Sequence, residues 1–200
     1  MLGMHRESRT PVVLDISSIL RSVMVLLERS MTEAGVTVRT RLATNAVATG
    51  YPAELRQVFT NILTNAAQAS APGTHIDVSV RTRPARRARS DAPARPAGVC
   101  IAFTDQGHGI PPKVLSDLFQ PFFTTKGERG TGLGLWISKG IVEKHGGTIS
   151  VESKTDPDDH GTTFNIFLPR GESGVESVPA AETKSPRKSE PERSEPTTVA

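Results

Sequence analysis

The side chains best suited to binding chemistry include a stripe of carboxamides. Asn61 and Asn65 are four residues apart, so on a helix they share one face. Gln57 and Gln68 lie beside them. Amide oxygens suit Mg²⁺, which keeps several waters and takes its remaining ligands from phosphates. The stripe is typical of a site for a hydrated cation or of a solvated polar face. The opposite face of the helix is apolar and holds Leu55, Val58, Phe59, Ile62 and Leu63.

A carboxylate and two glycines directly follow a predicted strand. The run is Asp105-Gln106-Gly107-His108-Gly109-Ile110. A carboxylate at the end of a strand can accept a hydrogen bond from an exocyclic amine such as that of adenine. Gly107 and Gly109 would let the backbone turn sharply and approach a flat ring. The same spacing occurs in ordinary turns and in calcium loops, but the acid-rich ligand set of a calcium loop is missing.

Three aromatic residues and a lysine form the third group. They stand in the run Phe119-Gln120-Pro121-Phe122-Phe123-Thr124-Thr125-Lys126. The rings would anchor a loop against the core, and they are equally compatible with plain core packing. Lys126 would then be placed to contact a phosphate.

Glycines open a predicted helix in the fourth group. The run is Gly130-Thr131-Gly132-Leu133-Gly134-Leu135. Glycine-rich backbone at the start of a helix presents free N–H groups and the positive end of the helix dipole to an anion. The run lacks the Lys-Ser/Thr pair of a Walker loop, and it does not follow a strand as a dinucleotide fingerprint does.

The elements that must position these groups follow from the hydrophobic periodicity. Apolar residues at helical spacing predict a first helix from Ile16, capped by Asp15 or Ser17 and ended by Gly35. A short helical turn is expected after Pro111-Pro112. Two further helices are predicted over residues 52–70 and about 132–145. After an extended lead-in at 11–16, strands are predicted over residues 36–42, 74–82, 98–105, 147–154 and 161–168.

Composition limits the class of protein. A chain of 200 residues with 36% hydrophobic residues has enough length for one domain with its own core. One cysteine excludes an internal disulfide framework. No apolar run is long enough to cross a bilayer, and the first residues do not resemble a signal peptide. We therefore expect a cytoplasmic location.

The net charge of +3 is unevenly distributed. Segment 81–98 has six arginines and one aspartate, which gives +5, whereas residues 171–200 have six glutamates and four lysines or arginines, which gives −2. The rest is neutral, so we expect no nucleic-acid partner. Composition also predicts a disordered insertion loop at 83–98 and a disordered tail at 170–200, with residues 1–10 as a linker remnant before one domain at 11–169.

In this order, the four groups resemble the asparagine box, first glycine box, phenylalanine box and second glycine box of the histidine-kinase ATP-binding domain (HATPase_c, in the GHKL superfamily). The resemblance covers about residues 11–169 and includes Leu55-Arg56-Gln57-Val58-Phe59, Gly147-Thr148-Ile149 and Gly161-Thr162-Thr163-Phe164. It implies the Bergerat ATP-binding fold. This fold is α+β, a two-layer α/β sandwich with a mixed sheet and about three helices on one face.

The resemblance also implies the cofactors ATP and Mg²⁺ and a role for each matching residue. Asn65 resembles the Mg²⁺ ligand, and Asp105 resembles the acceptor of the adenine amine. Asn61 resembles the residue that faces the phosphates, where ATP-hydrolysing relatives have a glutamate as general base. An amide cannot take a proton, which favours phosphoryl transfer over hydrolysis. The implied catalytic residues are Asn61, Asn65 and Lys126. The implied ATP-binding residues are Asn61, Asn65, Asp105, Gly107, Gly109, Ile110, Phe119, Lys126, Gly130, Thr131, Gly132, Leu133, Gly134 and Thr162.

A histidine kinase also needs an acceptor histidine on a dimerising helix. The predicted first helix begins too early to leave room for that hairpin, and His5 is interpreted as a linker residue. We therefore expect two partners in a two-component phosphorelay. They are a histidine-bearing dimerisation domain, upstream or on another chain, and a downstream response regulator. The chain would then be the cytoplasmic end of a larger sensor or a separate module.

Three alternatives within the same superfamily stay open at this point. They are an ATP-binding regulatory module, an anti-sigma-type serine kinase and, disfavoured by Asn61, an ATPase. One departure from the family pattern is Gln68, which stands where many members have a basic residue.

Overall fold

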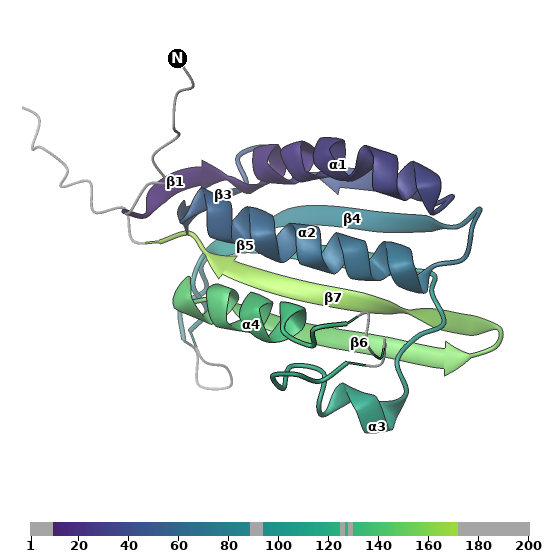
Figure 1. Ribbon diagram of the computed structural model, residues 1–200. Helices are drawn as coiled ribbons and strands as arrows, with labels where there is room; N and C mark the ends of the chain where they lie inside the picture. The colour runs from purple at the N-terminus through teal and green to yellow at the C-terminus, as the bar shows by residue number, and fades with distance from the viewer. Residues whose placement is uncertain (1–9, 89–93, 125–126, 128–129, 172–200) are drawn as a thin grey trace, which may run out of the picture.

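Five strands form a mixed sheet in the order β2-β4-β5-β7-β6 (Figure 1). β2 (Thr37–Leu42) runs parallel to β4, and the other neighbours are antiparallel. The remaining strands of this sheet are β4 (His75–Arg83), β5 (Gly98–Asp105), β6 (Thr148–Asp156) and β7 (Asp159–Pro169). A separate two-stranded sheet pairs β1 (Val12–Asp15) with β3 (Val47–Gly50). The computed structural model describes residues 10–88, 94–124, 127 and 130–171.

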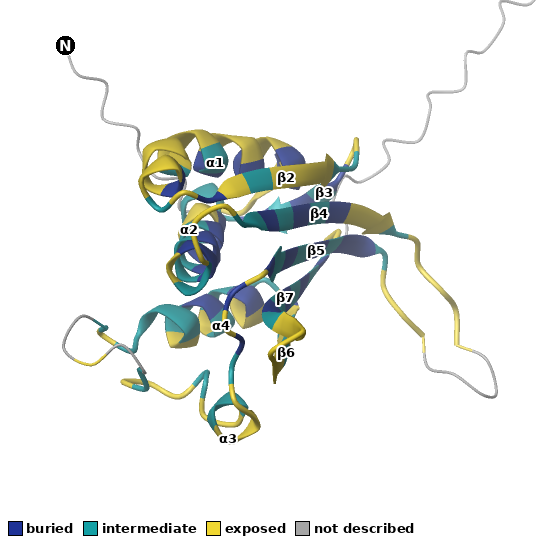
Figure 2. Ribbon diagram, turned by 90° about the vertical axis from the view of Figure 1, so that its right-hand side faces the viewer, coloured by how far each residue is buried: buried dark blue, intermediate teal, exposed yellow. Residues whose placement is uncertain are grey.

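Three long helices cover one face of the large sheet, and the other face is open (Figures 1 and 2). They are α1 (Ile16–Glu33), α2 (Pro52–Ala69) and α4 (Gly134–Lys144), while the short α3 (Pro112–Leu115) lies outside this layer. The two-layer sandwich with a mixed sheet and three helices on one face is the fold predicted from the sequence. Among the described helices, none is long and apolar enough to span a membrane.

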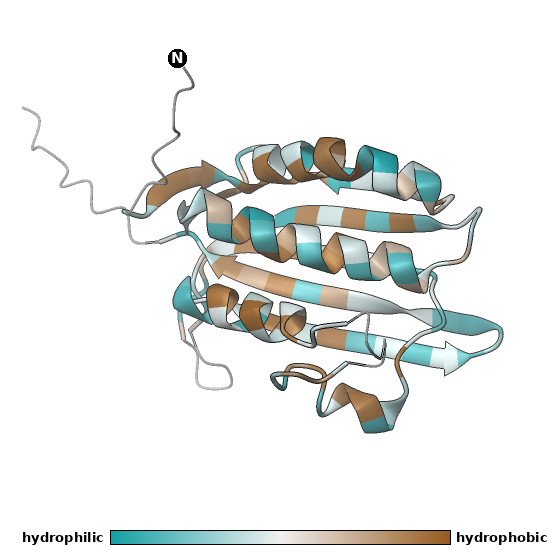
Figure 3. Ribbon diagram, in the orientation of Figure 1, coloured by the Kyte–Doolittle hydropathy of each residue, from teal (hydrophilic) through white to brown (hydrophobic). Residues whose placement is uncertain are grey.

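The core lies between the helices and the sheet. Along β4, buried Ile76, Val78 and Val80 alternate with less buried polar residues, a pattern visible as brown and paler bands in Figure 3. α2 contributes its apolar face, and the centroid of the Phe59 ring lies 5.9 Å from the centroid of the Phe103 ring on β5. Both rings are almost fully buried, so α2 is fixed against the centre of the sheet.

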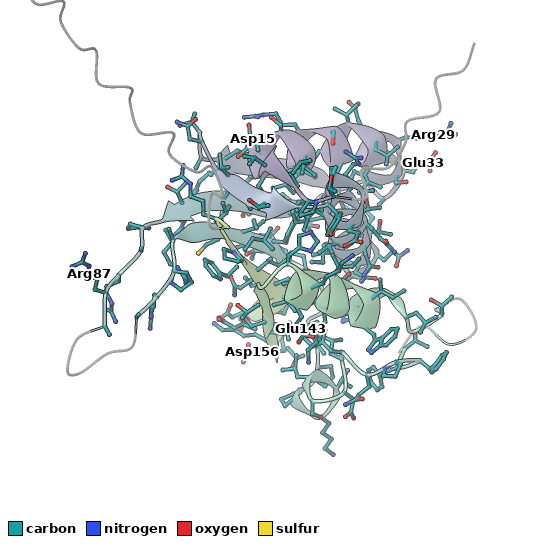
Figure 4. The ribbon with its side chains drawn as sticks, turned by 90° about the vertical axis from the view of Figure 1, so that its left-hand side faces the viewer. Asp15, Arg29, Glu33, Arg87, Glu143 and Asp156 are labelled. Atoms are coloured by element: carbon teal, nitrogen blue, oxygen red, sulfur yellow. The ribbon has the colours of Figure 1, made fainter. Side chains whose placement is uncertain are left out.

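The two ends of the sheet differ in chemistry. At one end, Asp105 of β5 pairs in register with Thr162 of β7. At the other end, β4 and β5 extend as an arm in which Arg86 and Arg95 form an isolated antiparallel bridge. Arg83 at the base of the arm lies over the ring of Phe167, 3.6 Å from its centroid. Arg87 projects from the arm, away from the sandwich (Figure 4).

Several element boundaries differ from the prediction. β1 and β3 were not both expected as strands, because each is only four residues long and shows no clear period. α4 begins at Gly134, since Gly132 has a left-handed φ of 65° that a helix does not continue. β2 is mostly exposed, because it is an edge strand.

The disorder predictions fall largely outside the described residues. Residues 89–93 of the predicted loop at 83–98, residues 172–200 of the predicted tail at 170–200 and residues 1–9 of the predicted linker at 1–10 are not described, so these predictions stay untested there. Arg83 and Gly98, the ends of the proposed insertion, belong to β4 and β5.

Replacing Phe59 by alanine should lower the free energy of unfolding by about 3–5 kcal/mol, because it removes a fully buried aromatic ring. Urea denaturation followed by circular dichroism measures this. The control is Val25→Ala on the exposed face of α1, where the side chain is 72% exposed and the change should stay within about 0.5 kcal/mol. Equal losses in the two variants would contradict the placement of the core.

Candidate functional site

The Asp105 carboxylate is the most deeply buried ionisable group of the candidate site. The residue is 4% exposed at the end of β5. The backbone N–H groups of Gly107 and Thr162 both donate to its Oδ1, over 2.9 and 3.2 Å. Burial raises the pKa of the Asp105 carboxyl above its ordinary value, while these two hydrogen bonds and the nearby His108 lower it in part. A buried carboxylate with an oxygen beyond those bonds is a strong acceptor for a ligand amine.

The glycines of the loop that follows are packed against protein backbone. A Cβ on Gly107 would lie 2.6 Å from the carbonyl oxygen of Ala69, the last residue of α2. Gly109 has a φ of 71°, and a Cβ there would collide with the carbonyl of Lys154 on β6. The spacing of these glycines in the sequence predicts a close approach to a flat ring. In the structure these glycines let the loop, residues 105–110, lie tightly between α2 and β6, and their contact with a base stays a prediction.

α2 carries the amide stripe from one end of the site to the other. Asn61, Asn65 and Ala69 are spaced four residues apart, so the stripe extends about 12 Å along the helix. The carbonyl of Ala69 accepts a hydrogen bond from the N–H of His108 over 3.4 Å. Asn61 Nδ2, at the other end, donates to Ser138 Oγ of α4 over 3.0 Å. Asn65 lies midway between these two contacts, half-buried.

The start of α4 lies against Asn61 and has the features of an anion site. A Cβ on Gly134 would come within 2.9 Å of Asn61 Nδ2, so only glycine fits there without a shift. Leu133 stands at the N-cap position and makes no side-chain capping bond, so no side chain of the cap competes for the first-turn N–H groups. These groups and the helix dipole favour a negatively charged ligand.

The phenylalanine group supports the second glycine loop through its backbone. A Cβ on Gly132 would lie 2.6 Å from the carbonyl oxygen of Phe122. Phe122 itself has a left-handed φ of 64° and is 75% exposed, an unusual state for a bulky residue. The loop is therefore held in a strained backbone conformation with one ring turned to solvent.

The structure thus brings most of the predicted residues into two groups. Asp105, Gly107, Gly109, Ile110 and Thr162 meet at one end of α2, and Asn61, Gly132, Leu133 and Gly134 meet at the other. Gly130 is half-buried and Thr131 exposed just before the second group. Lys126 lies outside the described residues, so its predicted role stays a prediction.

Phe119 lies apart from both groups. It lines a hollow of about 800 Å³ between α2, α3 and α4, together with Trp136, and Asp105 is not among the lining residues. Lys139 Nζ of α4 lies 5.7 Å from the centroid of the Phe119 ring. A second hollow, of about 440 Å³, touches the outer side of the first glycine loop at Gly107 and His108. Phe119 therefore supports the helical layer.

Sequence reasoning missed the residues that tie these groups together. Ser138 holds Asn61, Ser153 of β6 bonds to the N–H of Ile110, and His160 of β7 bonds to the carbonyl of Gly107. Serine and histidine at strand or helix positions have no distinguishing pattern, so no sequence signal pointed to them.

The donor set fits a nucleotide with its cation. Within the described ranges, no three His, Cys, Asp or Glu residues are grouped so that they could hold a metal by themselves. A cation here would take its ligands from amide oxygens, water and the ligand, as Mg²⁺ does beside phosphates. The buried acceptor at Asp105 and the uncapped start of α4 would meet the two chemically different ends of such a ligand.

Sequence comparison identifies relatives of known kind. The family described as histidine kinase-, DNA gyrase B- and HSP90-like ATPase matches residues 50–172. Sporulation kinase A of Bacillus subtilis is 31% identical over 171 residues, which cover 85% of this chain and 26% of that protein. Sensor histidine kinase ZraS of Escherichia coli is 44% identical over 118 residues, which cover 59% of this chain and 22% of that protein. The chain thus spans about a quarter of the length of these relatives.

Structural comparison gives the same kind of match. A mycobacterial sensor histidine kinase, MprB, is similar with a TM-score of 0.67 at 28% identity, covering 80% of this chain and 97% of that one. The catalytic domain of the histidine kinase ThkA is similar with a TM-score of 0.66 at 24% identity, covering 80% and 95%. The ThkA likeness is evidence for the fold alone.

Asp105→Asn should stabilise the ligand-free chain at neutral pH. Asparagine keeps an oxygen for the N–H groups of Gly107 and Thr162 but removes the buried charge. Because the pKa of Asp105 is raised in the folded chain, that chain binds the proton more tightly than the unfolded chain does. Wild-type stability should therefore fall as the pH rises from the ordinary pKa near 3.8 through the raised value.

The measurement is urea denaturation of both chains between pH 4 and 8. The stability difference should grow with pH in favour of Asp105→Asn and should shrink toward the acid end. The exposed Asp117→Asn serves as a control, because it removes a carboxylate that is not buried. If Asp105→Asn were less stable than the wild type at pH 7, the fold would be shown to stabilise the charged carboxylate.

Proposed function

Because the chain belongs to the histidine kinase-, DNA gyrase B- and HSP90-like ATPase family, we propose that it is the ATP-binding catalytic domain of a sensor histidine kinase. It would bind Mg-ATP and transfer the γ-phosphoryl group to a histidine of a dimerisation domain. The family membership predicted from the four sequence groups is confirmed by the match over residues 50–172. The observation that carries the proposed reaction is the pairing of a buried acceptor, Asp105, with an uncapped helix start at α4.

The adenine end of the proposed site is the loop at Asp105. The Gly107 and Thr162 N–H groups occupy Oδ1, so Oδ2 is the oxygen we assign to the exocyclic amine of adenine. Thr162 and Ile110 would border the base. A buried carboxylate can accept a hydrogen bond from an amine of the ligand. It would reject a ligand carbonyl at the same position, because neither the carbonyl nor the carboxylate has a proton to donate.

The phosphate end is the start of α4. Its first-turn N–H groups and the glycines at 130, 132 and 134 would receive the phosphates, with Thr131 and Leu133 between them. Mg²⁺, bound by Asn65, would neutralise phosphate charge. Lys126 would add a cationic contact. Since phosphoryl transfer depends mainly on positioning and charge neutralisation, these groups would supply this chain's part of the reaction.

Asn61 favours transfer over hydrolysis. Its amide already donates to Ser138 Oγ, and it cannot act as a base toward water. A neutral imidazole is a competent nucleophile near neutral pH and needs no strong base. The acceptor in the proposed reaction is therefore a histidine, held on an upstream segment or another chain, and a response regulator would receive the phosphoryl group next. We place the domain in the cytoplasm, where ATP and such partners occur.

The first test is nucleotide binding. Titration of a fluorescent ATP analogue into the chain should show saturable binding that unlabelled ATP competes. Asp105→Asn should weaken binding by about 1.5–3 kcal/mol, because it removes a charged acceptor for the adenine amine. Asn65→Ala should remove the dependence on Mg²⁺ while leaving weak, metal-independent binding.

Arg56→Ala, on the exposed side of α2, is the matched control and should bind as the wild type does. Absence of any ATP-competed binding to the wild type would refute the proposed function. Unchanged affinity in Asp105→Asn would refute the assignment of the adenine end alone.

The second test is the reaction itself. With radiolabelled Mg-ATP, the chain should not label itself but should label a dimerisation domain from its own system. The label should be lost in acid, since phosphohistidine is acid-labile, and Asn65→Ala should reduce it by at least about tenfold through loss of the metal ligand.

Other outcomes would select the alternatives. Acid-stable label on a partner protein would indicate an anti-sigma-type serine kinase. Rapid release of free phosphate without a partner would indicate an ATPase, and binding with neither reaction would indicate a regulatory module.

A further inference from the structure

The hydroxyl of Ser153 lies at the centre of a hydrogen-bond network that contacts residues 105–110, called the adenine loop below because the proposed function places the base there. It accepts from the N–H of Ile110 over 2.8 Å and lies 2.8 Å from the carbonyl oxygen of Gly161. It also lies 2.9 Å from Oγ1 of Thr162, and Thr162 is the residue opposite Ser153 in the β6–β7 register. One half-buried side chain of β6 therefore contacts both the loop and the neighbouring strand.

Proton counting fixes the direction of these bonds. A carbonyl oxygen only accepts, so the single hydroxyl proton of Ser153 goes to Gly161. The bond to Thr162 must then be donated by the Thr162 hydroxyl. Thr162 is buried, and once its hydroxyl proton is donated to Ser153, the hydroxyl oxygen can offer a ligand or water only its two lone pairs as acceptors. Ser153 thus orients Thr162, whose own N–H already donates to Asp105.

His160 forms a second contact from the same hairpin. Its Nδ1 lies 2.7 Å from the carbonyl oxygen of Gly107, so Nδ1 carries a proton and donates it. The side chain comes from β7, two residues before Thr162, and is solvent-exposed. The loop is then held at Gly107 by His160 and at Ile110 by Ser153, on both sides of Gly109.

We propose that Ser153 and His160 are positioning residues of the β6–β7 hairpin, which hold the adenine loop and Thr162 in the arrangement that receives the base. This inference rests on the proposed function, since it concerns the same nucleotide site. Neither side chain needs to touch ATP. Ser153 acts through Ile110 and Thr162, and His160 acts through the backbone of Gly107.

The test uses the full 200-residue chain and calorimetric titration with ATP and with ADP, each with and without Mg²⁺. Ser153→Ala should bind both nucleotides about tenfold more weakly. The factor should be the same for ATP and ADP and independent of Mg²⁺, because the loss occurs at the base end. Ser150→Ala, an exposed serine on the opposite face of the same strand, should leave affinity unchanged.

A histidine pair tests the second contact independently. His160→Ala should weaken binding about threefold, whereas His160→Asn should stay close to wild type, because the asparagine amide can donate from the position of Nδ1. This pair decides the question if Ser153→Ala does not fold.

A double-mutant cycle with Thr162→Val separates positioning from general destabilisation. If the two hydroxyls act as one unit, the double variant should lose less than the product of the single losses. Faster hydrogen exchange at the Ile110 amide is expected in Ser153→Ala at temperatures where the chain stays folded.

Wild-type binding together with affinities within twofold in Ser153→Ala and His160→Ala would overturn the positioning role and leave the proposed function intact. Failure of the wild type to bind ATP would refute the proposed function itself. A loss that differs between ATP and ADP would place the effect at the phosphates and would also overturn the inference.

Discussion

The buried carboxylate of Asp105 is the constraint on which the candidate site depends. A charge with 4% exposure needs hydrogen-bond donors, and here backbone N–H groups from two distant parts of the chain supply them. The chain must turn back within two residues so that the Gly107 N–H reaches the Asp105 carboxylate, and Thr162 must lie directly opposite Asp105 on β7. Both the β5–β7 register and the tight loop are therefore needed to bring hydrogen-bond donors to the Asp105 carboxylate. A neighbouring constraint falls on Gly161, where a Cβ would strike the carbonyl of Asp105.

α2 turns this local constraint into the geometry of a whole site. The carbonyl of Ala69 at its end contacts the loop at residues 105–110, and its amide at Asn61 holds α4 through Ser138 in the second turn of that helix. Because Phe59 and its apolar neighbours fix the helix against the sheet, the distance between these two contacts cannot change much. A ligand with a base at one end and phosphates at the other would meet a rigid spacing.

Local patterns were sufficient for the long elements and the four motif groups. The apolar stripe of α2 and the cap at Asp15 depend on neighbours in sequence, and the structure has both. β3 is too short for a period, and its pairing with β1 depends on contacts more than thirty residues away in the chain. Ser138, Ser153 and His160 act only through tertiary contacts, so their roles have no local signal. The sequence predicts a sharp turn at Gly107 and Gly109. The backbone that fills the space beside them could be known only from the fold.

The amide at Asn61 connects the architecture of the site to the choice of reaction. A glutamate there could accept a bond from Ser138 but could not donate one, and its charge would lie beside Gly134 at the start of α4. That carboxylate would compete with phosphate for the positive end of the helix while gaining the ability to activate water. Asparagine instead uses its N–H to hold α4 and leaves the helix start to an anionic ligand. In the proposed function, Asn61 would thus both disfavour hydrolysis and shape the phosphate end of the site, and the two properties would follow from the same side-chain chemistry.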